Sequence, residues 1–304
     1  MSRFLRSFAM SSTFILIATL APAENVKSWV GESVVYKKHP SEIKFGDTSN
    51  GKQINLELSG RLPIRVVEER DGKLRILDNN LEGWVDRDEF MLVRDAPPYF
   101  ERLIKANPKD VWPLIMRGIM WSQKGNLDSA IKDFTDCIRL DPKYADVYLN
   151  RGCAWEKKSE YDLAIKDYDD LIHLRPKYSL AFFNRGNAWC KKNDYAKAIA
   201  DYDEAMRLDP KDPSALDNQA YLLATCPDNK YRNIPKAKEL MKTVVKLRPQ
   251  SPYTEDTLSV IAAAEGRFED AIKHLKKALE DKGYTEWKGA KARDLLKAYE
   301  EKRP

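Results

Sequence analysis

The sequence predicts a mostly α-helical protein in which a helical-hairpin solenoid follows a small all-β barrel. One observation is a period of 34 residues, shown by Pro108, Pro142, Pro176 and Pro210. A second is that short β-branched runs concentrate before residue 95. The third is composition, because 43% hydrophobic and 33% charged residues in a chain of 304 are typical of a folded protein with charged surfaces.

Residues 1–23 are expected to be a secretory signal peptide. Arg3 and Arg6 supply the positive start, residues 14–20 form a short apolar core, and Ala-Pro-Ala provides small residues at the cleavage site. The apolar run is shorter than the roughly 17 residues that a membrane span needs. We therefore expect an exported protein, periplasmic or secreted, with no integral membrane segment after cleavage.

Charge and residue usage argue against several function classes. Cleavage would remove two arginines and no acidic residue, so the net charge falls from +5 to +3, which is no footprint for nucleic acid. The three histidines are far apart, and the four cysteines form no Cys-x-x-Cys pair. We expect no metal, no cofactor and no catalytic residues. We also expect free thiols, with Cys153 and Cys190 as the one candidate disulfide.

Residues 24–95 are expected to form a small β domain. In one run, Leu74 and Ile76 alternate with Lys73 and Arg75, which is the period of a half-buried strand. Asp-Gly before this run favours a tight hairpin turn. Strands are expected at residues 34–36, 63–67, 73–77, 83–85 and 90–93.

This order of strands, with a long loop after the first and Gly-Trp-Val near the end, resembles the bacterial Src-homology-3-like domain. The resemblance implies a small barrel. The aromatic motif that lines a proline-peptide groove in eukaryotic relatives is missing, because residues 34–38 read Val-Val-Tyr-Lys-Lys. The sequence therefore gives no support for polyproline binding. Trp84 could be a ligand platform or barrel core, and we favour core because such a strand usually buries its ring.

From residue 96 the chain is expected to be a helical repeat, since four further residue types share the 34-residue period. They are Gly118, Gly152 and Gly186; Trp121, Trp155 and Trp189; Ala130, Ala164 and Ala198; and the aromatics Phe134, Tyr168 and Tyr202. This pattern resembles the tetratricopeptide repeat. Numbering the 34 positions of each unit as places one to thirty-four, small residues stand at places eight and twenty, an aromatic at place twenty-four and proline at place thirty-two. The resemblance implies antiparallel helix pairs that stack into a right-handed superhelix.

The repeats are expected to span residues 96–281. A half unit comes first, and a capping helix is expected over residues 282–304. The fourth unit carries five extra residues within 226–235. The full units are expected at 111–144, 145–178 and 179–212, followed by the longer fourth unit and a fifth at about 252–281.

The tetratricopeptide resemblance implies a concave groove, lined by first helices, that binds extended or helical peptides. Read onto this chain, places two, five, nine and thirteen give a candidate apolar stripe with a basic edge. The alternative is that the β domain or the capping helix covers it. The carboxylate clamp of chaperone-binding members is absent, because only Asn150 matches it. The candidate groove residues are Trp112, Ile115, Ile119, Leu149, Phe183, Lys157 and Lys191.

A second set of residues is expected to be structural. Arginine stands at place seven of units one to three, and aspartate stands at place twenty-three of the same units. Both are replaced in units four and five, which suggests an ion pair that bridges the two helices of a unit. The expected pairs are Arg117 with Asp133, Arg151 with Asp167, and Arg185 with Asp201.

Together these observations predict a non-catalytic exported scaffold that binds protein or peptide in the groove of the repeats. The alternative is a cell-envelope protein in which the N-terminal barrel recognises peptidoglycan or its peptides and the repeats present it. The identity of the partner and the oligomeric state are not predicted.

Overall fold

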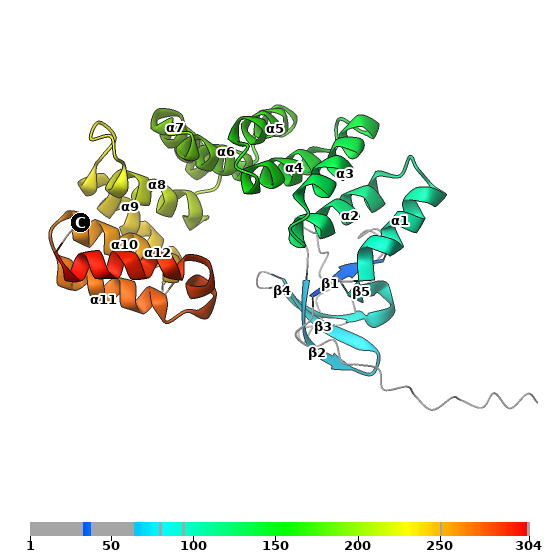
Figure 1. The fold of residues 1–304 in the computed structure, drawn as a ribbon, viewed down its shortest axis with the longest axis horizontal. Helices are drawn as coiled ribbons and strands as arrows, with labels where there is room; N and C mark the ends of the chain where they lie inside the picture. The colour runs from blue at the N-terminus through cyan, green and yellow to red at the C-terminus, as the bar shows by residue number, and fades with distance from the viewer. Residues whose placement is uncertain (1–32, 38–63, 79–80, 93–94, 250, 303–304) are drawn as a thin grey trace, which may run out of the picture. The chain divides into compact units, whose positions relative to one another are not determined.

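The computed structural model describes residues 33–37, 64–78, 81–92, 95–249 and 251–302 (Figure 1). The chain divides into two compact units, with the boundary after Leu92. The expected signal peptide, residues 1–23, lies outside the described residues. Among the helices that are described, none is both long enough and apolar enough to cross a membrane.

The N-terminal compact unit contains an antiparallel sheet in the order β4-β3-β2-β1-β5. β4 and β5 form its two edges within the described residues, so a sheet is present and closure into a barrel remains a prediction. The strands are β1 (Ser33–Tyr36), β2 (Ile64–Arg70), β3 (Lys73–Asp78), β4 (Leu81–Asp86) and β5 (Phe90–Leu92).

One face of this sheet is a buried apolar layer. Leu74 and Ile76 of β3 and Val85 of β4 are each at most 2% exposed. Trp84 precedes Val85, so its side chain points to the opposite face. There it is half-buried, and the guanidinium of Arg70 lies 5.9 Å from its ring centroid. The expectation that Trp84 belongs to the core was therefore wrong, because strand alternation gives the buried position to Val85.

The C-terminal compact unit consists of helices that pack in sequence as antiparallel pairs (Figure 1). The described helices are α1 (Ala96–Ala106), α2 (Val111–Gln123), α3 (Leu127–Leu140), α4 (Ala145–Lys157), α5 (Tyr161–Leu174), α6 (Ser179–Lys191), α7 (Tyr195–Leu208), α8 (Pro213–Thr225), α9 (Ile234–Leu247), α10 (Pro252–Ala264), α11 (Phe268–Leu279) and α12 (Lys282–Glu300). α1 is the half unit, α2 to α11 form five pairs, and α12 takes the place of the expected capping helix.

The turn between the helices of a pair is set by place fifteen. Gly125, Ser159 and Asn193 hold this place in the first three units, with φ values of 78°, 63° and 61°. A residue in the left-handed region ends a helix and reverses the chain. The same backbone conformation therefore recurs with three different residues, and the repeat period is preserved.

The helices of a pair approach closely where the sequence places glycine. A Cβ atom on Gly118 would lie 2.6 Å from Phe134 Cε1, and one on Gly152 would lie 2.6 Å from Tyr168 Cε1. Tyr168 is fully buried against this gap. Place eight is small because the aromatic ring at place twenty-four fills the space a side chain would need.

Candidate functional site

The arginines at place seven bind the aspartates at place twenty-three in all three units. Each arginine donates Nε and Nη2 to the two carboxylate oxygens, a bidentate arrangement that is among the strongest of ion-pair geometries. The N–O distances are 2.9 and 2.7 Å for Arg117 with Asp133, 2.9 and 2.6 Å for Arg151 with Asp167, and 2.8 and 2.6 Å for Arg185 with Asp201.

Two of these arginines also join consecutive units, which sequence reasoning missed. Arg151 Nη1 donates to Thr135 Oγ1 at 3.0 Å, and Arg185 Nη1 donates to Asp169 Oδ1 at 2.6 Å. In the fourth unit Gln219 Nε2 donates to Asp203 Oδ1 at 2.9 Å. The acceptor always stands sixteen residues earlier, on the second helix of the preceding unit. Place seven therefore links three helices, and the glutamine keeps the link between units.

The electrostatics of these pairs reflect burial and bonding together. The hydrogen bond to Asp201 raises the pKa of Arg185 against the opposing effect of burial. Burial raises the pKa of Asp167, and the hydrogen bonds from Arg151 act against that rise. The aspartate side chains are buried and the arginines are partly exposed, so each carboxylate depends on its arginine for compensation of charge. These residues hold the scaffold together and offer no ligand site.

We call the surface formed by places two, five, six, nine, twelve and thirteen of α2, α4, α6, α8 and α10 the first-helix face. Its beginning differs from the sequence expectation. Ile115 and Ile119 are 6% and 8% exposed, and the Trp112 ring packs edge-to-face on Phe100 of α1, with centroids 5.5 Å apart. The expected apolar stripe therefore needs correction at Ile115 and Ile119, which are buried and leave little surface for a ligand, whereas Trp112 stays half-buried.

The next two positions of the expected stripe are half-buried. Leu149 packs against the buried clusters of α4, α5 and α6. Phe183 packs against buried residues of α7 and α8, with its ring centroid 6.2 Å from that of Tyr202. Each side chain therefore has one side in the core and one side at the surface. Of the candidate apolar residues, Trp112, Leu149 and Phe183 therefore retain accessible area.

The two lysines of the expected basic edge are exposed. Lys157 stands at the end of α4 and Lys191 at the end of α6. Lys157 Nζ donates to Ser122 Oγ of α2 at 3.4 Å, which is a long bond. Because this hydrogen bond is weak, the ammonium group of Lys157 can turn to another acceptor at low cost.

A polar network links α6 to α8 on the same face. Asn218 Nδ2 donates to Asn187 Oδ1 at 2.8 Å, and Tyr202 OH donates to the same oxygen at 2.7 Å. Asn218 stands 34 residues after Asn184, which itself stands 34 after Asn150. The asparagine at place six thus recurs on α4, α6 and α8. That recurrence was visible in the sequence and could have shown that amide groups line this face.

α4 carries a half-buried glutamate, Glu156, at place twelve. Tyr168 OH donates to Glu156 Oε2 at 2.8 Å and lies 3.6 Å from Cys153 Sγ. Burial raises the pKa of Glu156, and it raises the pKa of the Cys153 thiol to about 11. The thiol is therefore protonated at neutral pH and is no nucleophile. All four cysteines are free, and no cluster of three potential metal ligands occurs among the described residues.

The first-helix face changes character in the last two units. Place five is aspartate there, and both carboxyl groups are buried: Arg248 donates to Asp217, and Lys288 of α12 donates to Asp256 at 3.0 Å. The Lys288 ammonium also lies 5.3 Å from the ring centroid of Tyr221 on α8. The space that these residues enclose has no room for water. α12 therefore covers this end of the face, which lies beyond the residues of the expected apolar stripe.

Comparisons with known proteins agree with the helical architecture. Residues 116–179 and 179–212 each match a family model of the tetratricopeptide repeat. The chain is similar to the crystal structure of PilW, a widely conserved type IV pilus biogenesis factor, at TM-score 0.54 and 18% identity, covering 63% of this chain and 87% of that one. It is also similar to yeast Tom70, at TM-score 0.52 and 22% identity, covering 67% of this chain and 42% of that one.

No curated protein matches the sequence. At these identities the similarity to solved structures is one of fold alone. The central helices are tetratricopeptide repeats, and the described helices follow the arrangement of such repeats.

Proposed function

We propose that this protein is a non-catalytic scaffold that binds a peptide segment of a partner protein on the first-helix face of α4 and α6. One observation carries the proposal. Leu149 and Phe183 hold the same place on these helices, each with one side at the surface, and the exposed Lys157 and Lys191 stand eight residues further along each helix. Repeat scaffolds use such extended surfaces for protein recognition.

The chemistry of this surface defines the ligand class. Two apolar anchors in successive units fit an extended segment with spaced apolar side chains. The lysines fit an acidic group on one side of that segment. Amide groups at place six, such as Asn150 and Asn184, can donate and accept hydrogen bonds with a peptide backbone. Export is part of the proposal, supported by the pattern of residues 1–23, and N-terminal sequencing of the secreted or periplasmic protein tests it.

A library of short random peptides displayed on phage tests the binding proposal. Peptides are selected on the full chain and their affinity is measured for two variants. Phe183→Ala removes an anchor that contributes roughly thirtyfold in affinity. The matched control is Phe182→Ala, the neighbouring half-buried phenylalanine, whose ring faces the Arg185 guanidinium at 5.5 Å.

We expect both variants to lose stability and only Phe183→Ala to lose peptide affinity. Selected peptides that bind the two variants equally well would refute the proposed site. If the selection yields no peptides that compete with one another for a single site, peptide binding on this face is refuted altogether.

A further inference from the structure

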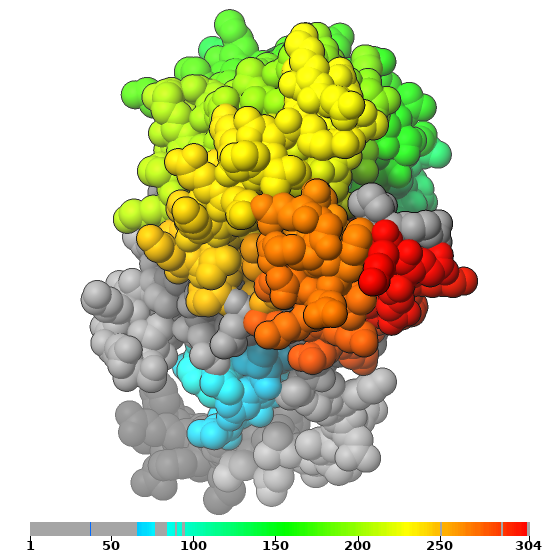
Figure 2. All heavy atoms as spheres, turned by 90° about the vertical axis from the view of Figure 1, so that its left-hand side faces the viewer, coloured from blue at the N-terminus to red at the C-terminus, as the bar shows by residue number. Residues whose placement is uncertain are grey.

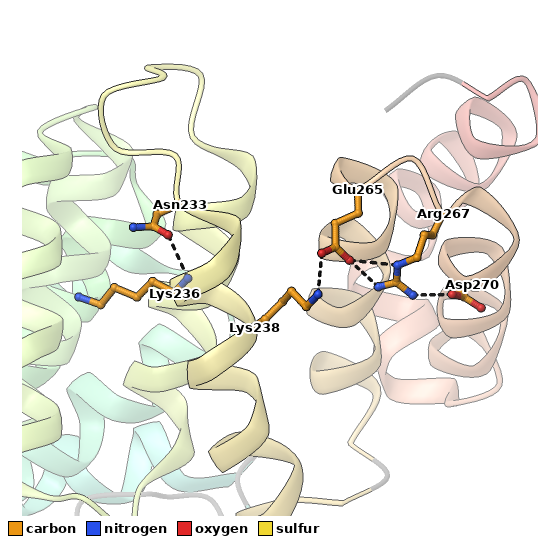
Figure 3. Close-up of polar contacts among 6 residues, drawn as sticks. All are labelled: Asn233, Lys236, Lys238, Glu265, Arg267 and Asp270. Atoms are coloured by element: carbon orange, nitrogen blue, oxygen red, sulfur yellow. Dashed lines mark hydrogen bonds and ion pairs between the residues drawn. The ribbon is translucent and has the colours of Figure 1, made fainter.

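A cleft opens between the fourth and fifth units, away from the first-helix face. It lies between α9 and the turn that joins α10 to α11, and its volume is about 440 Å³. Figure 3 shows Lys238 reaching across it from α9 to Glu265, with Nζ 2.6 Å from Oε1. The lining residues are Pro235, Lys238, Glu239, Lys242 and Glu265.

The cleft has a cause in the sequence. Place twenty-one, on the second helix of a unit, is isoleucine in the first three units: Ile131, Ile165 and Ile199. Ile131 and Ile165 are buried, and Ile199 is partly buried in the core. In the fourth unit this place is Lys238, whose side chain is 49% exposed. A lysine at a packing position cannot close an apolar interface, so α10 packs closely on α8 and less closely on α9.

The exposed face of α9 extends toward the C-terminal end of the helix. Place twenty-eight is half-buried in the first three units, but in the fourth it is Val245, which is 42% exposed. Lys238, Lys242 and Lys246 follow one another at intervals of four residues, so their charges repel along one helix face. Figure 2 shows the yellow-gold atoms of this part of the chain at the surface beside the orange atoms of α10 and α11. α9 therefore presents a basic row and an apolar side chain that no helix of the described residues covers.

Glu265 does not neutralise this row. Its carboxylate accepts from Arg267 at 3.0 and 2.7 Å as well as from Lys238, so it is already shared between two cations. The net charge of residues 230–304 is positive, like the charge of the lysine row. Residues 230–304 carry 18 Lys and Arg against 12 Asp and Glu, a net charge of +6, whereas residues 96–229 carry 20 against 21, a net charge of −1.

We propose that the cleft beside α9 docks an acidic amphipathic helix of a partner protein. Three lysines at intervals of four residues match carboxylates at the same intervals on an antiparallel or parallel helix. A small apolar residue of that helix would cover Val245. This site lies on second helices, so it is separate from the peptide site on first helices, and each can exist without the other.

The test uses the full chain and a synthetic helical peptide with glutamates at i, i+4 and i+8 and leucines on one flank. A peptide with lysines in place of the glutamates is the control ligand. Lys242→Glu reverses one charge of the row and keeps the Lys238–Glu265 ion pair. The matched control is Lys276→Glu, the same change at an exposed lysine of α11.

We expect Lys242→Glu to weaken the acidic peptide by about tenfold or more, and Lys276→Glu to change its affinity by less than about twofold. A second variant, Lys238→Ile, restores the residue type of the other units. It should abolish peptide binding and raise the melting temperature, because α9 can then pack on α10. Folding of this variant is read directly from its melting curve.

The proposal would be overturned by equal binding of the acidic and basic peptides, by equal effects of the two lysine reversals, or by unchanged binding in Lys238→Ile. Loss of acidic-peptide binding in Phe183→Ala would place that ligand on the first-helix face and would also contradict the cleft. Self-association that Lys242→Glu abolishes would identify the occupant as a second copy of the chain, which the proposal excludes.

Discussion

Replacing the arginine of a place-seven ion pair should lower the free energy of unfolding more than replacing the aspartate, because the carboxylate left behind is the more deeply buried partner. The Asp167 side chain is 2% exposed, and the Arg151 side chain is 17% exposed. Arg151→Leu leaves a buried carboxylate without its bidentate partner, which costs about 3–5 kcal/mol of unfolding free energy. Asp167→Leu leaves a guanidinium that keeps its bond to Thr135 and some contact with water, so we expect about 1–3 kcal/mol.

The pH dependence of Arg151→Leu gives an independent check. Burial raises the pKa of Asp167 in the native protein, and the variant lacks the hydrogen bonds that act against this rise. When the pKa of a group is higher in the folded than in the unfolded state, its contribution to the free energy of unfolding is most favourable below the unfolded pKa. That contribution is lost as the pH rises through the folded pKa. The deficit of Arg151→Leu should therefore shrink as the pH falls to about 4, the pKa of an unfolded aspartate.

Urea unfolding of both single variants and of Arg151→Leu/Asp167→Leu measures these effects. The double variant should lie within about 1 kcal/mol of the native protein, because two apolar residues replace a buried ion pair at little net cost. Equal losses in the two single variants, or a deficit of Arg151→Leu that persists at about pH 4, would refute this account of the pair.

Three further predictions concern packing, the thiols and acid stability. Gly152→Ala should lower stability by about 1–2 kcal/mol in urea unfolding, because the clash with Tyr168 exceeds the gain in helix propensity, and a stabilised variant would contradict the close approach. Cys137, whose pKa burial raises to about 12, should resist iodoacetamide at pH 8 until urea unfolds the chain, as peptide mapping would reveal. Burial acts to raise the pKa of Glu255, but hydrogen bonds from Lys277 and His274 outweigh it and lower the pKa, so this stabilisation is present above the unfolded pKa and is lost as the pH falls below about 4. Glu255→Gln should therefore differ from the native protein at neutral pH and converge with it in acid.

The periodic part of this fold could be predicted because its causes are local. Gly152 and Tyr168 are sixteen residues apart and meet within one helix pair, so a fixed spacing encodes their contact. The place-seven arginines could be matched to their aspartates for the same reason, since the residue types appear and disappear together. The bonds between units follow the same spacing in the other direction and were missed because the acceptor is threonine at 135 and aspartate at 169 and 203, while the donor changes from arginine to glutamine in the fourth unit.

The parts that could not be predicted depend on contacts between distant segments. Lys288 of α12 reaches Tyr221 of α8, a relation that no period contains. Ile115 is 6% exposed although its place was expected to face a ligand, and spacing alone does not report such burial. Lys238 breaks the isoleucine pattern of place twenty-one, but its consequence, a cleft, becomes visible only when the packing of α9 and α10 is known.

Site-specific photo-crosslinking tests the central claim, that the first-helix face of α4 and α6 binds a peptide. A benzophenone amino acid replaces Asn184 on α6 in one variant and Lys166, an exposed residue of α5, in the other. Both are irradiated with a peptide selected on the full chain. We expect the benzophenone at position 184 to crosslink to the peptide and the one at position 166 not to do so. Crosslinking from position 166 with none from position 184 would contradict the central claim.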